Sequence, residues 1–383
     1  MKKNKHLDAN QIIEQARAET GLSDFGAPQL DPPYFEMVDS INETAAPTPE
    51  GAEGRRQHIK HLLANRLKLT EYLRRNQGIA EADIGTPIFI IGLPRSGTTK
   101  LHRLIARDSQ FNTTPLWECF SPVPALDGDD SHTRFNYADN FCRAMAETCP
   151  EFFAAHPIFA KEPEECHALM QHSFLTESIE AELRIPDHIL WLSRLDHRPM
   201  YEQHALFLRV LGHARKRTEA PWLLKGVYHA ISLEIILSLH PTAVIVHCHR
   251  DPVDTIASYA SLIAKMRSML SDDVKPGQVG PEILAHWSQH SSMAVEVRDR
   301  VPDDRIIDVP YSDIVHKVPS VVEKVYQKAG LELSASAIEA MNQWDSQNPQ
   351  HSHGHHRYSA EEYGLSPEKI AEQCSAYRSR FIL

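Results

Sequence analysis

The chain has 383 residues, a formal net charge of −11 at neutral pH and 42% hydrophobic residues, a composition typical of globular proteins and unlike that of disordered or fibrous ones. The negative charge argues against non-specific binding of nucleic acid, because such binding depends on neutralising phosphates. No segment approaches the roughly 18 apolar residues of a membrane span, and the polar N-terminal segment does not match a secretion signal. We therefore expect a cytoplasmic protein that binds no nucleic acid and has no membrane span.

The cysteines are scattered along the chain and include no CxxC pair. This spacing argues against a zinc site and against a disulfide framework, so we expect reduced, unpaired thiols and no structural metal. The six residues are Cys119, Cys142, Cys149, Cys166, Cys248 and Cys374.

The first 80 residues have a helical pattern that is interrupted by Pro32 and Pro33. The second helical stretch, from about Gly51 to Asn76, has leucine and isoleucine residues at near-helical spacing, and Gly78 is a suitable residue to end it. The pattern predicts a helical N-terminal extension over residues 1–80.

From Pro87 onward, strand and helix patterns alternate, which is typical of a parallel sheet with helices on both faces. We therefore predict an α/β fold, a P-loop-type three-layer sandwich with a central parallel sheet, over residues 81–383. The mostly helical stretch 110–220 would be an insertion between the first two strands, on the acceptor side. The strands are expected at 88–92, 221–225, 242–248 and in IIDVPY after Arg305, and the helices from Thr98, at 229–239, from Pro252, at 318–329 and at 334–345.

The segment PIFIIGLPRSGTTK joins an apolar strand to a helix through a glycine-containing loop. Gly92 and Gly97 match the outer glycines of a nucleotide-triphosphate loop, but Thr98 stands where that loop has its lysine, and a cation appears at Arg95 instead. Such a loop directs backbone N–H groups and the positive end of the helix at an anion. A tight turn that needs glycines only for its backbone angles is the alternative, but it leaves the hydroxyl groups and Arg95 unexplained.

A second apolar strand, VIVHC, is followed by His249, Arg250 and Asp251. Asp251 can cap the next helix and Pro252 suits its first position. Arg250 then lies at the carboxyl end of a parallel strand, where open α/β sheets bind ligands, and Ser258 follows eight residues later. The alternative is a surface pair of Arg250 with Asp251 and an exposed helix serine.

Both motifs resemble those of the sulfotransferases that use 3′-phosphoadenosine 5′-phosphosulfate (PAPS). GLPRSGTT resembles their 5′-phosphosulfate loop, and the Arg250 and Ser258 spacing resembles their 3′-phosphate signature. The resemblance covers roughly residues 85–383 and implies PAPS as co-substrate, without a required metal. Arg95 stands where many members have lysine, so its role would be electrostatic, since arginine does not readily donate its proton. The implied nucleotide-binding residues are Arg95, Ser96, Gly97, Thr98, Thr99, Arg250 and Ser258.

The segment PWLLKGVYHAI resembles the family segment in which a lysine and a histidine face the transferred group. This resemblance makes His229 the first candidate for the general base, and Lys225 a residue that neutralises developing negative charge. A carboxylate in KEPEECHAL, Glu165, is the competing base. Acidic residues at a helix start are also common as partners of the helix dipole, without any chemistry.

The segment QHSHGHHRYS near the C-terminus contains His351, His353, His355 and His356. A metal site is one interpretation of this cluster. No acid or cysteine joins the histidines at a ligand spacing, which argues against a metal, and the resemblance to sulfotransferases implies a late cationic loop that closes over the nucleotide. In that loop Arg357 would contact phosphate and Tyr358 would stack or form a hydrogen bond.

The favoured function is therefore transfer of a sulfuryl group from PAPS to a hydroxyl of a small or lipid-like acceptor. An ATP-dependent kinase or NTPase is the first alternative, but the lysine is missing and no clear magnesium-binding acid follows a strand. A catalytically silent nucleotide-binding protein is the second alternative. Neither the identity of the acceptor nor the oligomeric state has a signal in the sequence.

Overall fold

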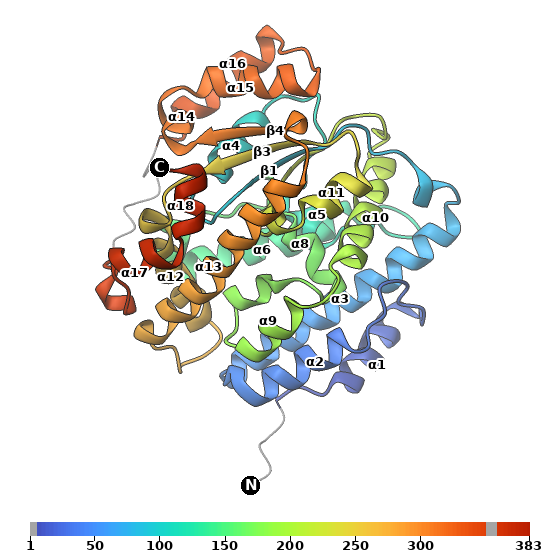
Figure 1. Ribbon diagram of the computed structural model, residues 1–383. Coiled ribbons are helices and arrows are strands. Elements are labelled where there is room, and N and C mark those ends of the chain that lie inside the picture. The colour runs from blue at the N-terminus through green and yellow to red at the C-terminus, as the bar shows by residue number, and fades with distance from the viewer. Residues whose placement is uncertain (1–5, 350–357) are drawn as a thin grey trace.

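The computed structural model describes residues 6–349 and 358–383. Its centre is a four-stranded sheet with the strand order β2-β1-β3-β4, visible in the upper part of Figure 1. Every pairing is parallel, which confirms the predicted α/β class. The strands are β1 (Ile88–Gly92), β2 (Leu223–Lys225), β3 (Val244–His249) and β4 (Ile306–Pro310).

The sheet is covered on both faces, as buried parallel strands require. Along β1, Ile88 and Ile90 join one hydrophobic cluster, whereas Phe89 and Ile91 join another on the opposite face. The first face is covered by α4 (Thr98–Ile105), α14 (Tyr311–His316), α15 (Val318–Ala329) and α16 (Ala335–Gln347). The opposite face is covered by α10 (Arg198–Ala214), α11 (Leu233–Leu239) and α13 (Pro276–Arg300). The predicted three-layer sandwich is confirmed.

The N-terminal helices pack into the same core as the second face of the sheet. Ile12 of the first helix and Leu63 of the third belong to one cluster with Phe89 of β1. A boundary between a separate extension and the α/β domain at residue 80 therefore stays a prediction. The N-terminal elements are α1 (Ala9–Thr20), α2 (Pro33–Ser40), η1 (Ile41–Ala45), α3 (Pro49–Arg75) and η2 (Ile79–Glu81).

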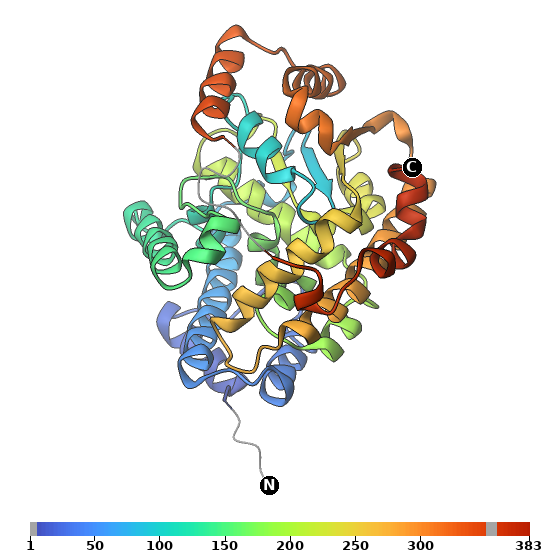
Figure 2. The same ribbon diagram turned by 90° about the vertical axis from the view of Figure 1, so that its left-hand side faces the viewer.

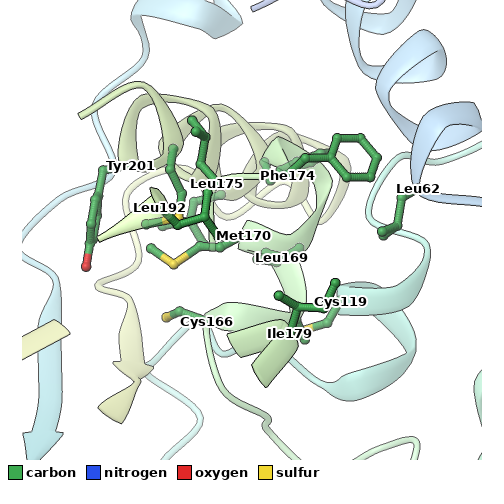
Figure 3. Packing of buried hydrophobic residues seen from close by; sticks show 14 of the residues in the cluster. Leu62, Cys119, Cys166, Leu169, Met170, Phe174, Leu175, Ile179, Leu192 and Tyr201 are labelled. Atoms are coloured by element: carbon green, nitrogen blue, oxygen red, sulfur yellow. The ribbon is translucent and has the colours of Figure 1, made fainter. Parts of the chain in front are cut away.

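The helical insertion between the first two strands supplies a second layer of apolar packing. Leu169, Met170 and Leu175 belong to the same buried cluster as Tyr201, which lies at the edge of the group in Figure 3. The arm that includes α6 stands out from the body at the left of Figure 2. The elements are α5 (Leu116–Phe120), α6 (Ser131–Thr148), α7 (Pro150–Ala155), α8 (His167–Met170), η3 (Gln171–Ser173), η4 (Glu177–Ala181) and α9 (Pro186–Leu192).

The C-terminal half differs from expectation at several helices, among them α14, which begins at Tyr311 where a strand was expected to end. The predicted helix 229–239 is a 3-10 turn, η5 (Val227–Ile231), followed by α11. The helix α13 was not predicted because its buried face includes Gly280, His290 and Ser291 in place of a continuous apolar stripe. The remaining elements are α12 (Pro252–Ser268), η6 (Asp303–Arg305), η7 (Glu361–Tyr363), α17 (Pro367–Gln373) and α18 (Ser375–Phe381).

All six cysteines are free thiols, which confirms the prediction of unpaired cysteines. Among the described residues, no helix combines the length and the apolar character that crossing a bilayer would require.

Candidate active site

The loop between β1 and α4 has the shape of an anion cradle. Gly92 has φ +151° and Gly97 has φ +90°, and a Cβ on Gly92 would collide with the carbonyl oxygen of Cys248. Arg95 itself has φ +66°, an uncommon angle for a residue with a side chain. Gly97 is the N-cap of α4 and has no side-chain capping bond, so the helix directs its N-terminal amides and the positive end of its dipole at the loop.

The hydroxyl groups of the loop occupy distinct positions. Ser96 is fully buried and its Oγ donates to the carbonyl of Leu93 at 2.6 Å, which closes the turn from within. Thr98, the first residue of α4, is buried. Thr99, the next residue, accepts a hydrogen bond from Lys225 Nζ at 3.4 Å. The loop is therefore tied to the end of the neighbouring strand β2.

The two arginines of the two anion motifs lie together. Arg250, directly after β3, donates from Nη1 to the backbone carbonyl of Arg95 at 3.1 Å, and its guanidinium stacks on Tyr311 at 4.1 Å from the ring centre. Arg95 donates from Nη1 to the carbonyl of Ala155 at 3.0 Å. Burial and the charge of Arg250 both lower the pKa of Arg95. Among the described residues, neither guanidinium has a carboxylate within ion-pair distance.

Asp251 does not pair with Arg250. Its Oδ1 accepts from the backbone amide of Val253 at 3.0 Å, and thus caps α12 as predicted, and it pairs with Arg378 of α18 at 3.0 Å. The alternative of an Arg250–Asp251 surface pair is therefore not what the structure shows. Ser258 is buried in α12, so it is not an exposed helix serine either. Its role toward a phosphate stays a prediction.

A buried ion pair joins the end of β2 to the insertion. Lys225 is fully buried and its Nζ lies 2.6 Å from Glu165 Oε1 and 3.8 Å from Glu164 Oε1. Burial alone would raise the pKa of Glu165, but Lys225 and the hydrogen bond with His167 outweigh burial and hold this pKa well below its ordinary value. Glu165 is therefore an ionised carboxylate, joined through Lys225 to the loop between β1 and α4.

The backbone around Glu165 is fixed on both sides. The amide of Cys166 donates to the carbonyl of Lys225 at 2.8 Å, and the amide of Glu164 donates to the carbonyl of Thr114 at 2.8 Å. Cys166 itself points into the apolar packing of Figure 3. The ion pair is therefore held from the backbone as well as through its charges.

His229 lies in a different environment from the other candidates. It is 1% exposed, its Nδ1 is 2.8 Å from Tyr201 Oη, and its ring meets Phe89 edge to face. Its Nε2 has no hydrogen-bond partner among the described residues. Burial lowers the pKa of His229 to about 3. The ring is therefore neutral and belongs to the packing under the sheet.

The other acids in KEPEECHAL pair with Arg103 of α4 and with Arg107, just beyond the end of that helix. Arg107 forms a double hydrogen bond with Glu162, at 3.2 and 2.7 Å, and Arg103 lies 3.8 Å from Glu164. Arg103 lies on α4 and Arg107 in the turn that follows it, and their four-residue spacing is the signal that could have revealed these pairs. Glu162 and Glu164 are thus explained by ion pairing.

The C-terminal loop is described only in part. Tyr358 lies close enough to Arg95 to act on its pKa, and its role in a closing loop stays a prediction. Arg357 and the histidines of QHSHGHH lie outside the described residues. The structure thus brings together Arg95, Thr99, Lys225, Glu165 and Arg250 at the carboxyl edge of the sheet. No hydrogen bond among the described residues joins His229 or Ser258 to this group.

Comparison with known proteins agrees with this geometry. Residues 87–335 match the sequence profile of the Sulfotransferase family. The chain belongs to the sulfotransferase family. The matched region includes both anion motifs and the Lys225–Glu165 pair, and it confirms the resemblance seen in the two motifs.

Similar proteins come from mycobacteria. The chain is 23% identical over 258 residues to the omega-hydroxy-beta-dihydromenaquinone-9 sulfotransferase Stf3 of Mycobacterium bovis and to that of Mycobacterium tuberculosis, covering 66% of this chain and 65% of each relative. The crystal structure of sulfotransferase STF1 from Mycobacterium tuberculosis matches with a TM-score of 0.79 at 26% identity, over 97% of this chain and 99% of that one. Sulfotransferase STF9 from Mycobacterium avium has the same fold, with a TM-score of 0.85 at 23% identity over 98% and 97%.

Proposed function

We propose that the protein transfers a sulfuryl group from PAPS to a hydroxyl of a lipid-like acceptor. The observation that carries the proposal is the contact between Arg250 and the backbone of Arg95, because it places the two anion motifs side by side. One nucleotide with a phosphate at each end of its ribose would then engage both motifs. Family membership through residues 87–335 supports the same assignment.

The residues present fit such a donor. The two glycines allow the positive φ angles with which the loop turns into α4, and the guanidinium groups of Arg95 and Arg250 lie together without a carboxylate partner among the described residues. Two adjacent cations repel each other, so a ligand that carries several negative charges is stabilised by both. Arg95 and the amides of α4 would hold the 5′ end, and Arg250 with Ser258 the 3′-phosphate.

The donor supplies an activated sulfuryl group whose transfer resembles phosphoryl transfer, in which positioning and charge stabilisation dominate. Lys225 lies between Thr99 of the loop and Glu165, so its ammonium stabilises negative charge at either side. When an anion bound in the loop also interacts with the ammonium of Lys225, Lys225 stabilises the ionised form of Glu165 less. The pKa of Glu165 then rises. Glu165 then accepts the proton of the attacking hydroxyl, and Arg95 stabilises the leaving oxygen without donating a proton.

Glu165 fits the role of base better than His229 does. The carboxylate of Glu165 is ionised, and Lys225 connects it to the loop because its Nζ contacts both Glu165 and Thr99. The imidazole of His229 is 1% exposed, its Nδ1 is engaged by Tyr201, and no hydrogen bond among the described residues joins it to the loop or to Lys225. The glutamate, the second candidate from the sequence, is therefore the base that we propose.

The acceptor proposed is apolar apart from its hydroxyl. A group of aromatic side chains lies in the insertion beside α7, whose Ala155 carbonyl holds Arg95. The named activity of the mycobacterial relatives is on the omega-hydroxyl of a menaquinone derivative, a long apolar molecule. The aromatic residues are Trp117, Phe120, Phe135 and Phe153.

The test is transfer of labelled sulfate from PAPS to two acceptors that share a primary hydroxyl, a long-chain alcohol in detergent and ethanol. We expect label on the long-chain alcohol and little on ethanol. If the protein binds adenosine 3′,5′-bisphosphate but labels neither alcohol, the result would favour the alternative of a catalytically silent nucleotide-binding protein.

A further inference from the structure

A buried group of histidine and carboxylate side chains lies behind the active site and has no role in the proposed reaction. Glu177 comes from η4, and His286 and His290 come from α13. The two histidines are four residues apart, so they project from one face of the helix. Glu177 and His290 are 3% and 4% exposed. Sequence spacing did not reveal the group, because Glu177 and His290 are 113 residues apart in the chain.

The ligand atoms of these residues have metal-site spacing. Glu177 Oε2 lies 3.0 Å from His290 Nε2 and 3.6 Å from His286 Nε2, and one ligand atom from each residue can be chosen so that all lie within 4.8 Å of one another. Two ligands on a tetrahedral zinc ion, each about 2.1 Å from the metal, lie about 3.4 Å apart. The observed spacing is therefore close to that of a formed site.

Two buried atoms of the group lack hydrogen-bond partners. Among the described residues, neither Glu177 Oε1 nor His286 Nε2 has one. A buried polar atom without a partner costs about 1–3 kcal/mol, so such atoms call for an explanation.

The surroundings of the group are those of a supported metal site. Glu180 Oε1 lies 3.6 Å from His286 Nε2 and accepts hydrogen bonds from Trp287 Nε1 and Tyr228 Oη, both at 3.1 Å. Tyr228 belongs to η5, the turn that follows Lys225. A cation held by this group would thus connect η4, α13 and η5 beneath the active site.

A second histidine and aspartate group is less suited to a cation. His247, His249 and Asp308 also lie close together, but Asp308 Oδ2 accepts a hydrogen bond from Arg298 at 2.9 Å. The guanidinium of Arg298 repels a cation at that position.

We propose that Glu177, His286 and His290 bind one divalent transition-metal cation in a structural site. Two imidazoles and a carboxylate match the ligands of zinc, and Glu180 is close enough to serve as a fourth ligand or to orient His286. The ion takes no part in sulfuryl transfer. It holds the helix α13 against η4 and, through Glu180 and Tyr228, fixes the turn after Lys225.

The test uses the full chain without an affinity tag, treated with a chelator, incubated with Zn²⁺ and separated from free metal. Elemental analysis is expected to find about one zinc per chain, and Co²⁺ in place of zinc is expected to give a visible absorption band. The variants His290→Gln and Glu177→Gln are expected to lower zinc affinity by at least about 100-fold. Zinc is expected to raise the melting temperature of the unchanged protein and not that of the variants.

Two controls make the outcome decisive. His316→Gln, at an exposed position on α14, is expected to leave binding unchanged. Replacement of His351, His353, His355 and His356 by Gln is also expected to leave zinc binding unchanged. If zinc binding were lost only in that variant, the proposal would be overturned and the metal assigned to the C-terminal segment. Less than about 0.1 zinc per chain in the unchanged, folded protein would also overturn it. If His290→Gln does not fold, zinc binding by Glu177→Gln decides, with circular dichroism to show that this variant is folded.

Discussion

Lys225 Nζ lies 2.6 Å from Glu165 Oε1, and both side chains are buried. The two residues come from β2 and from the insertion, 60 positions apart. Lys225 is also the group that reaches Thr99 in the phosphate loop. This pair therefore connects the stability of the site to its proposed chemistry, and both can be measured.

The pair is expected to stabilise the fold. Lys225→Met and Glu165→Gln each leave a buried group without its partner, so each is expected to lower the free energy of unfolding by about 3 kcal/mol. The double variant is expected to cost clearly less than the sum. Urea denaturation measures all three. Lys317→Met, which breaks an exposed pair with Asp313 on α14, serves as control with an expected change within about 0.5 kcal/mol. If each single variant lowered the free energy of unfolding by less than about 1 kcal/mol and the two effects were additive, the proposed coupling of Lys225 and Glu165 would be contradicted.

Glu165→Gln is expected to lower kcat by at least about 100-fold, because the amide cannot accept the proton of the attacking hydroxyl. The affinity for adenosine 3′,5′-bisphosphate is expected to change little. The matched change is Tyr201→Phe, which removes the hydrogen bond to His229 Nδ1 and is expected to leave kcat within about tenfold. A nearly normal rate in folded Glu165→Gln, together with a collapse in His229→Gln, would move the role of base to His229.

Buried histidines make the fold sensitive to mild acid. Burial lowers the pKa values of His102, His172 and His229 to about 3 and that of His156 to about 4, from an ordinary 6.5. Between pH 6.5 and about 4 the unfolded chain binds protons that the folded chain does not, so the free energy of unfolding falls as pH falls, by about 1.4 kcal/mol per pH unit for each proton. Glu165, whose pKa is lowered, contributes fully to the free energy of unfolding above pH 4.5. This contribution is lost only as the pH falls well below 4.5.

Calorimetry at pH 8, 7, 6 and 5 tests this expectation. We expect a melting temperature that is steady down to pH 7 and then declines, with uptake of about three or more protons on unfolding at pH 5. His167 opposes the trend, since its hydrogen bond with Glu165 raises its pKa in spite of burial. An unchanged melting temperature from pH 7 to 5 would contradict the account.

Local patterns allowed the strands and the loops that follow them to be predicted. The strand at 88–92 and the cap at Asp251 are where the sequence placed them, because buried apolar runs and capping residues act over a few positions. The same reasoning found Arg95 and Arg250, which follow directly from those strands.

Contacts between distant segments could not be predicted in this way. The pairing of Lys225 with Glu165 depends on how the insertion folds back on β2, and no local pattern encodes it. The burial of His229 depends on Tyr201 and Phe89, which come from other elements. The helix α13 was missed because its buried face is partly polar, and its histidines meet Glu177 only in the folded chain.

Arg250 is expected to determine recognition of the 3′-phosphate. Arg250→Ala is expected to weaken binding of adenosine 3′,5′-bisphosphate by more than about tenfold, since a hydrogen bond to a charged group contributes about 1.5–3 kcal/mol. Binding of adenosine 5′-monophosphate is expected to change little. Arg143→Ala, on the exposed face of α6, is the control. Equal losses for both nucleotides would remove the assignment of Arg250 to the 3′-phosphate.

The most direct measurement is calorimetric binding of adenosine 3′,5′-bisphosphate, adenosine 5′-monophosphate and ATP to the unchanged protein, each with and without Mg²⁺. Because the loop at Arg95 and the strand end at Arg250 are in contact, we expect the bisphosphate to bind more than about tenfold tighter than the monophosphate, without any need for Mg²⁺. Magnesium-dependent ATP binding with no binding of the bisphosphate would contradict the account.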